Sequence, residues 1–188
     1  RKQSKVNIVV NIMRERVVSP SVDTRISGHT GIIKITTFNQ GTSSSVDEAI
    51  KTLTKNKKIT SLIIDLRGNP GGLLRQAVKV ADLLLSEGVI VTTRGRHVDS
   101  LHAYKAKSNV ISPDIPLAIL LDGRSASAAE IVAAALQDQG RAILIGSTSF
   151  GKGTVQTVVR LPNEGEITLT WSRLIAPSGY IINGLGIK

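Results

Sequence analysis

A chain of 188 residues, of which 41% are hydrophobic, is long enough to bury roughly two thirds of its unfolded surface, so the sequence favours one packed domain. It has no cysteine, which excludes disulfides, thiolate metal sites and a cysteine nucleophile. The formal net charge of +10 would suit nucleic acid or anionic lipid, but the basic residues are spread along the chain and only 3% of residues are aromatic. We therefore expect a solvated basic surface and no nucleic-acid partner, and no apolar run is long enough to predict a membrane span.

The first half of the chain predicts a β-then-α rhythm. Residues 6–10 alternate like a strand, no long apolar signal segment precedes them, and a domain boundary is predicted near Pro20. Further strands are predicted at residues 31–37, 59–66 and 89–93, and helices at about 45–55 and 73–84. The stretch ITSLIIDL is almost unbroken in its apolar character, which is typical of a strand buried on both faces, and it ends in the turn RGNPGG.

The second half begins with the polar residues 94–115, which we interpret as an exposed loop or lid. PLAILLDG then predicts another buried strand, SASAAEIVAAALQDQG an alanine-rich helix that ends at Gly140, and RAILIG one more strand. The last part, TVQTVVRL and EITLTWSRL separated by PNEG, predicts a β-hairpin. The predicted fold class is α/β with a β-rich end.

One candidate for chemistry is the window GRSASAAEI, where a strand turns into a helix. Backbone N–H groups in the first turn of a helix are unpaired and can bind an oxyanion. Ser127 and Glu130 have the S-x-x-E spacing of a capping box, and taken alone that reading of Ser127 is favoured over a nucleophile. Ser125 could be the cap instead, which would leave Ser127 free to react, and spacing does not decide between them.

A second candidate is GSTSFGKGTVQT, in which Gly146, Gly151 and Lys152 match a phosphate-binding loop. Gly153 stands where that motif needs Ser or Thr, and the following residues favour a strand, so we do not expect nucleotide binding. A lysine between two glycines could be partly buried, and a lysine made neutral by burial is a usable base; a surface lysine in a turn is the plainer alternative. Gln156 lies four residues on, and in a strand it would share a face with Lys152.

Other titratable residues give weaker signals. The three histidines lie in polar segments without the spacing of metal ligands, so no metal site is predicted. Asp65 and Arg67 flank a turn, which favours a structural ion pair over catalytic chemistry.

Three blocks of this sequence resemble, in order, the signature blocks of the C-terminal processing peptidases, also called tail-specific proteases. The blocks are LIIDLRGNPGGLLRQAVKVADLLL, LLDGRSASAAEIVAAALQDQGRAILIGSTSFGKGTVQT and LIAPSGYIINGLGI. The resemblance extends from about Gly31 to the end of the chain. It implies a crotonase-like (ClpP-like) β/α spiral core with a β-hairpin-rich C-terminal part.

The resemblance also implies a set of site residues. The family's nucleophile falls on Ser127, its general-base lysine on Lys152 and its lysine-orienting glutamine on Gln156. The oxyanion donors would be the backbone N–H groups of Ala128 and of a glycine in the GNPGG turn, Gly71 or Gly72. The implied activity is a serine endopeptidase that cleaves proteins near an apolar C-terminal tail through an acyl-enzyme, without metal or cofactor.

Organisation and setting follow from the same resemblance. Residues 1–20 would be the last strand of a preceding PDZ domain with its connector, and residues 21–188 the peptidase core. The expected partners are protein or peptide substrates with C-terminal tails and, as a further candidate, a membrane-associated or envelope adaptor, in a bacterial periplasm or cell envelope. Two alternatives stay open: a catalytically silent relative that holds peptide tails, and an acyl-CoA enzyme of the crotonase fold.

Overall fold

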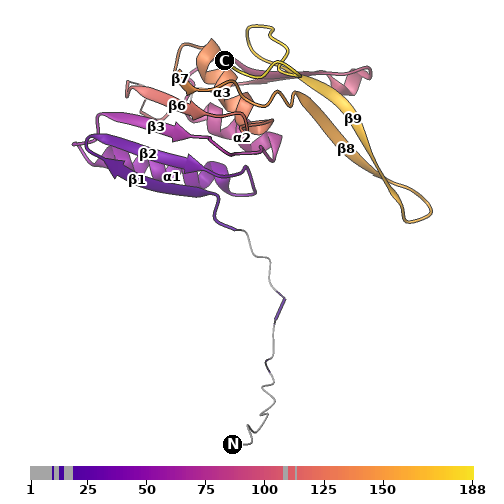
Figure 1. Cartoon of the computed structure of the whole chain (residues 1–188), viewed down its shortest axis with the longest axis horizontal. Helices are drawn as coiled ribbons and strands as arrows, with labels where there is room; N and C mark the ends of the chain where they lie inside the picture. The colour runs from indigo at the N-terminus through magenta and orange to yellow at the C-terminus, as the bar shows by residue number, and fades with distance from the viewer. Residues whose placement is uncertain (1–9, 11–12, 15–18, 108–109, 113) are drawn as a thin grey trace, which may run out of the picture.

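The computed structural model describes residues 10, 13–14, 19–107, 110–112 and 114–188. Two sheets and three α-helices make up its body, and a long hairpin extends from it (Figure 1). Most of the strand predicted at residues 6–10, and most of the proposed PDZ segment 1–20, lie outside the described residues. Among the helices of the described residues, none is long and apolar enough to cross a lipid bilayer.

The first sheet contains five strands in the order β1-β2-β3-β6-β7. Its strands are β1 (Val22–Ser27), β2 (Thr30–Ile35), β3 (Ser61–Asp65), β6 (Leu117–Leu121) and β7 (Ile143–Gly146). From β2 to β7 the strands run parallel, while β1 is antiparallel to β2. In β3 and β6 the fully buried residues largely alternate with partly buried ones, so one face of these strands is fully covered and the other only in part, which differs from the burial on both faces that the sequence predicted.

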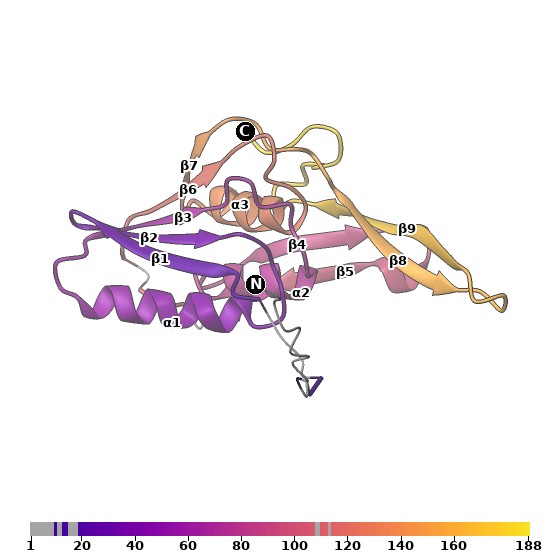
Figure 2. The same ribbon diagram turned by 60° about the horizontal axis from the view of Figure 1, so that its bottom comes forward.

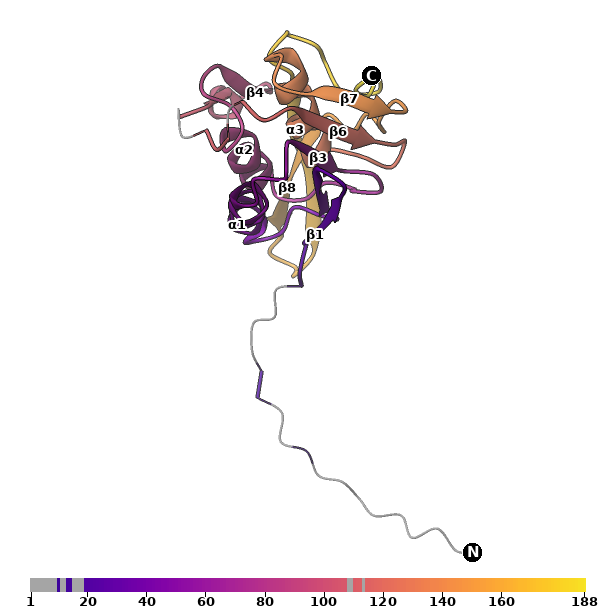
Figure 3. The ribbon, with the colours of Figure 1, turned by 90° about the vertical axis from the view of Figure 1, so that its left-hand side faces the viewer.

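The helices are α1 (Thr42–Lys55), α2 (Leu74–Asp82) and α3 (Ala128–Asp138). They lie together on one face of the five-stranded sheet (Figure 3). Every residue of α3 from Ala128 to Leu136 is buried, because the helix contacts α2, β7 and the second sheet. Its run of alanines permits this close packing on all sides, since a methyl side chain keeps the helix narrow.

The second sheet is antiparallel, with the order β5-β4-β9-β8. Its strands are β4 (Val89–Arg94), β5 (His102–Lys105), β8 (Thr154–Arg160) and β9 (Glu166–Ile175). Strands β8 and β9 form the predicted hairpin, and their outer part projects beyond the rest of the body (Figures 1 and 2).

The sequence predictions differ from the structure at three further places. Strand β1 was not predicted, because five of its six residues are exposed and carry little apolar alternation. The polar segment 94–115 contains the short 3-10 helix Val98–Ser100 and strand β5, so it is not an open loop throughout. Helix α2 ends at Asp82, two residues before the end predicted at residue 84.

Candidate functional site

Three turns meet at one edge of the five-stranded sheet. They follow β3, β6 and β7, which are adjacent and parallel, so their carboxyl ends lie side by side. The turn RGNPGG follows β3, the turn with Ser125 and Ser127 follows β6, and the loop with Lys152 follows β7. Ligands bind at such strand ends in open α/β sheets, so this edge is the candidate active site.

Ser127 occupies an unusual backbone conformation at the start of α3. Its φ of 55° and ψ of −111° lie outside the ordinary regions for a residue with a side chain. Residues held in such conformations cluster at active sites, because the surrounding structure must offset the strain. The predicted capping box is present as well, and its Glu130 half is a 2.6 Å hydrogen bond from Ser127 N to Glu130 Oε2.

The structure decides between the two serines of this window. Ser125 is completely buried; its Oγ donates to Leu66 O over 2.9 Å and accepts from Asp122 N over 3.0 Å. These bonds tie the end of β3 to the end of β6, so the Ser125 hydroxyl is structural. Ser127 is half-buried and is the N-cap of α3, so the cap is Ser127 and not Ser125.

The side chain of Glu130 joins the serine turn to the lysine loop. It is fully buried, and its Oε2 accepts both Ser127 N, at 2.6 Å, and Lys152 N, at 2.9 Å. Its Oε1 accepts Gly151 N, at 2.7 Å, and Ser149 Oγ, at 2.5 Å. One carboxylate therefore fixes the backbone of Ser127 relative to that of Lys152. Because both amide nitrogens bind the same oxygen, the distance between them cannot exceed the sum of the two hydrogen-bond lengths.

The two glycines beside Lys152 let the lysine loop pack against the C-terminal segment. Gly151 has a φ of +86°, and its N–H is already held by Glu130. A Cβ on Gly153 would collide with Asn183 N. The C-terminal segment is itself hydrogen-bonded to this loop, since Ile187 N donates to Ser149 Oγ over 2.7 Å. The position of Lys152 thus depends on chain segments far apart in the sequence.

The side chains of Lys152 and Gln156 do not reach the serine. Lys152 is exposed, which agrees with the plainer alternative of a surface lysine in a turn: both of its neighbours are glycines, and Phe150 is itself 66% exposed. Among the described residues, Lys152 Nζ makes no hydrogen bond with Ser127 or Gln156. Lys152 lies before β8 begins, and a bulge between Val155 and Gln156 interrupts the expected shared face.

The predicted oxyanion donors can be compared by the hydrogen bonds that their N–H groups already make. Gly71 N donates to Asn69 Oδ1 over 2.8 Å, so it is committed within the turn. Gly72 N and Ala128 N make no hydrogen bond within the described part of the chain. The turn is close to the serine, since a Cβ on Gly71 would lie 2.8 Å from Ser127 Cβ and 3.0 Å from Ala128 N. This favours Gly72 over Gly71 as the partner of Ala128.

Two carboxylates hold the RGNPGG turn in place. Asp65 binds the Arg67 guanidinium through two hydrogen bonds of 2.9 and 2.7 Å, and this contact lowers the pKa of the Asp65 carboxyl. The pair has the structural role expected from its position. Asp122, just before the serine turn, accepts from Gly68 N over 2.9 Å, and this bond is the main reason that the pKa of Asp122 falls to about 2.

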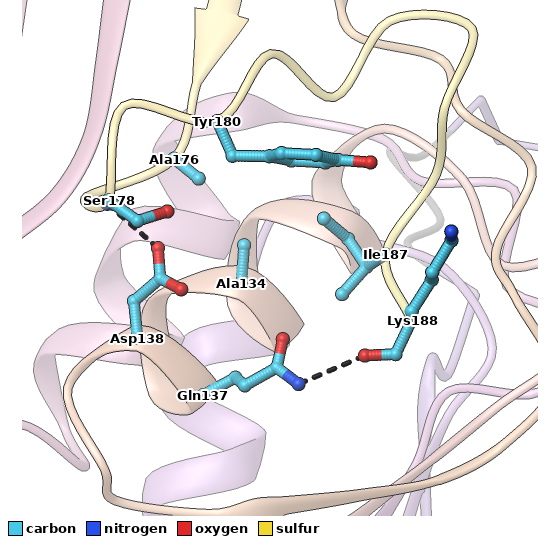
Figure 4. Close-up of a pocket in the computed structure, with 8 residues that line it drawn as sticks. All are labelled: Ala134, Gln137, Asp138, Ala176, Ser178, Tyr180, Ile187 and Lys188. Atoms are coloured by element: carbon cyan, nitrogen blue, oxygen red, sulfur yellow. Dashed lines mark hydrogen bonds between the residues drawn. The ribbon is translucent and has the colours of Figure 1, made fainter.

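A separate cavity of about 280 Å³ lies at the other end of α3 (Figure 4). It is lined by Ala134, Gln137, Asp138, Ala176, Ser178, Tyr180, Ile187 and Lys188. There Gln137 Nε2 donates to Lys188 O over 2.9 Å, and Ser178 N donates to Asp138 Oδ2 over 2.9 Å. Along α3, the first residue that lines this cavity is Ala134, about two helical turns after Ser127. The cavity is therefore distinct from the candidate active site. Its contacts hold the C-terminal segment that supports the lysine loop.

The fold and the strand-end turns define a mixed α/β protein, and comparison with known proteins gives its family. The pattern of peptidase family S41 matches residues 29–188, so the chain belongs to peptidase family S41. A carboxy-terminal-processing protease of Bartonella bacilliformis is 41% identical over 181 residues, which cover 95% of this chain and 42% of that protein. Carboxyl-terminal-processing peptidase 2, chloroplastic, of Arabidopsis thaliana is 36% identical over 95% of this chain and 36% of its own length.

A solved structure of similar fold supports the same assignment. The photosystem II D1 C-terminal processing protease is 30% identical with a TM-score of 0.81, over 93% of this chain and 48% of that one. The predicted crotonase-like (ClpP-like) α/β core is thereby confirmed, as is the resemblance to the C-terminal processing peptidases. The chain spans less than half the length of these relatives.

Proposed function

We propose that this chain is the catalytic core of a serine endopeptidase that cleaves proteins near an apolar C-terminal tail. Ser127 is the nucleophile, Lys152 the general base and Gln156 the residue that orients the lysine. The observation that carries the proposal is the buried Glu130 carboxylate, which binds the backbone of Ser127 and of Lys152 through the same oxygen. Family membership supports the peptidase class, and the resemblance of the sequence blocks implies the roles of the three residues.

The proposed reaction is acyl transfer in two steps. Lys152 Nζ takes the proton of Ser127 Oγ while that oxygen attacks a peptide carbonyl carbon, and the backbone N–H groups of Ala128 and Gly72 hold the oxyanion. The proton then passes to the leaving amine, the peptide C–N bond breaks, and a serine ester remains. Water, deprotonated by the same lysine, hydrolyses the ester and restores Ser127.

The exposure of Lys152 adds one requirement. A general base must be a neutral amine, and burial is what favours that form of a lysine. We propose that the bound peptide covers Lys152 and displaces its water. Catalysis then depends on the substrate completing the site.

The test compares Ser127→Ala and Lys152→Ala with the wild type in cleaving an unstructured protein that ends in an apolar tail. We expect both variants to lose at least a thousandfold in kcat/KM, within the range for removing one member of a catalytic group. Lys79→Ala, which changes an exposed lysine on α2, is the matched control and should cleave normally. Unchanged cleavage by either site variant would overturn the proposal.

A second candidate is a relative that binds peptide tails without cutting them. The exposed Lys152 side chain, which makes no hydrogen bond to Ser127 among the described residues, favours this reading. Tight binding of a tail peptide by the wild-type protein, with no cleavage over many hours, would support it.

Two proposals on organisation and setting accompany the function. Residues 1–20 are proposed to be the last strand of a PDZ domain with its connector, and residues 21–188 the peptidase core. A bacterial periplasm or cell envelope is the proposed location. The greater length of the relatives is consistent with a preceding domain.

A further inference from the structure

A basic groove of about 770 Å³ lies where the end of β4 meets β9. Its lining includes Arg94, Arg96, His97, Trp171 and Arg173, and we call these five residues the basic groove. The groove is formed by close backbone packing, since a Cβ on Gly95 would collide with Trp171 O. No residue of the proposed catalytic group lines it.

The groove holds positive charge that the chain does not neutralise. Arg94 and Arg173 are direct cross-strand partners, and like charges opposite one another destabilise a sheet. In the part of the chain that the structure describes, the guanidinium groups of Arg94, Arg96 and Arg173 form no ion pair and no hydrogen bond. The carboxylate recorded nearby is that of Asp99, which faces His97 at 3.4 Å and is 75% exposed.

The walls of the groove are aromatic and aliphatic as well as charged. Trp171 is 42% exposed, and its ring lies tilted against that of His97 with centroids 5.7 Å apart. Ile175 and Ile181, joined by a backbone bridge, add aliphatic surface. Arginine and tryptophan together suit a ligand with an anionic group on an otherwise apolar chain, because the guanidinium binds carboxylates in a fixed fork.

The groove is close to the candidate active site along the sheet. Arg173 on β9 pairs with Thr154 on β8, and Thr154 is the second residue after Lys152. Both strands leave the body there, at the base of the projecting hairpin (Figure 2). A peptide that passes the serine in an extended conformation would advance about 3.3 Å per residue, so a few residues separate the two sites.

We propose that the basic groove binds a carboxylate group of the peptide substrate while the chain passes the active site. The carboxylate can be the free C-terminus or an Asp or Glu side chain. This inference names the substrate class of the proposed peptidase and so rests on that function.

The test measures binding of tail peptides to the full chain carrying Ser127→Ala, so that no peptide is cleaved. One apolar peptide is prepared with a free carboxyl end, with an amidated end, and with an amidated end plus an internal Asp. Arg94→Gln and Arg173→Gln are compared with Arg25→Gln, an exposed arginine on β1 that makes no ion pair within the described chain. Circular dichroism confirms that each variant is folded.

We expect each groove variant to lose about tenfold in affinity for a carboxylate-bearing peptide and to keep its affinity for the neutral amidated one. A loss confined to the free-end peptide would assign the groove to the C-terminus, and a loss confined to the Asp peptide to a side chain. The proposal is overturned if both groove variants bind every peptide as Arg25→Gln does. Cleavage is scored separately in chains that retain Ser127, so arginine-dependent binding without cleavage would refute only the proposed function.

Discussion

Replacing Glu130 by glutamine changes one oxygen of the carboxylate that holds the serine turn and the lysine loop together. In the wild type each oxygen of Glu130 accepts two hydrogen bonds. The glutamine amide has only one acceptor oxygen, and its NH2 group can only donate. If the NH2 group takes the Oε1 position, the Ser149 hydroxyl can turn to accept from it, but Gly151 N is left facing another donor. If it takes the Oε2 position, the N–H groups of both Ser127 and Lys152 lose their acceptor.

The first orientation is therefore the cheaper one, and it sets the expected magnitude. One buried N–H without a partner costs about 1–3 kcal/mol, so Glu130→Gln should lower the free energy of unfolding by about that amount. Gly151 directly precedes Lys152, and a displacement of about 1 Å at a reacting group can cost a hundredfold in rate. We expect kcat to fall by about ten- to a hundredfold while KM changes little.

Urea unfolding and tail-peptide cleavage, both at a temperature where all proteins are folded, measure the two effects. Leu136→Ala is the control: Leu136 is fully buried on the same helix, and its truncation should cost about 2–5 kcal/mol without moving the serine turn. A wild-type cleavage rate for Glu130→Gln, or an equal loss of kcat in Leu136→Ala, would contradict the role assigned to Glu130.

Three further variants test other parts of the site. Ser125→Ala removes the buried hydrogen bond to Leu66 O and the partly buried one from Asp122 N, which should lower the free energy of unfolding in urea by about 1–3 kcal/mol. A serine-reactive phosphonate should still label this variant, and loss of labelling would mean that Ser125 is the nucleophile. Gly72 has a φ of +141°, and a Cβ there would collide with Phe38 O, whereas a Cβ on Gly28 would meet open space. Gly72→Ala should therefore abolish cleavage and destabilise the fold more than Gly28→Ala does. Equal effects of the two substitutions would contradict this packing. The pKa of Asp122, about 2 against an ordinary 3.8, means that its carboxylate stabilises the fold above about pH 4 and that this contribution is lost as the pH falls toward 2. Asp122→Asn should therefore lose less stability than the wild type between about pH 5 and pH 2.5 in urea titrations, and parallel losses would show that the group does not contribute.

The parallel sheet and its active edge could be predicted because burial leaves a strong pattern. Strands β3 and β6 are apolar runs between turns, and parallel strands place their carboxyl ends at one edge. The turns that carry Ser127 and Lys152 follow β6 and β7, which are adjacent parallel strands, so both turns lie at this edge. Strands β1 and β5 escaped prediction because mostly exposed strands carry no such pattern.

The contacts within the site were less accessible to sequence reasoning. The spacing of Ser127 and Glu130 predicted a capping box, in which the glutamate side chain accepts one hydrogen bond. In the structure Glu130 accepts four. The other three donors come from the lysine loop, about twenty residues away, and only the folded chain brings them there. The exposure of Lys152 depends in the same way on which side chains surround it.

The Glu130 contacts explain how the backbones of Ser127 and Lys152 are held close together while the lysine side chain stays exposed. The carboxylate binds the backbone of both residues, so their Cα positions are fixed without any contact between Ser127 Oγ and Lys152 Nζ. The strain at Ser127 is offset by the same short bond to its N–H. An exposed lysine on a fixed backbone moves only by changing its rotamer, so in the proposed mechanism a peptide that covers Lys152 selects the rotamer that reaches the serine. On this reasoning substrate binding should limit activity more than rearrangement of the core.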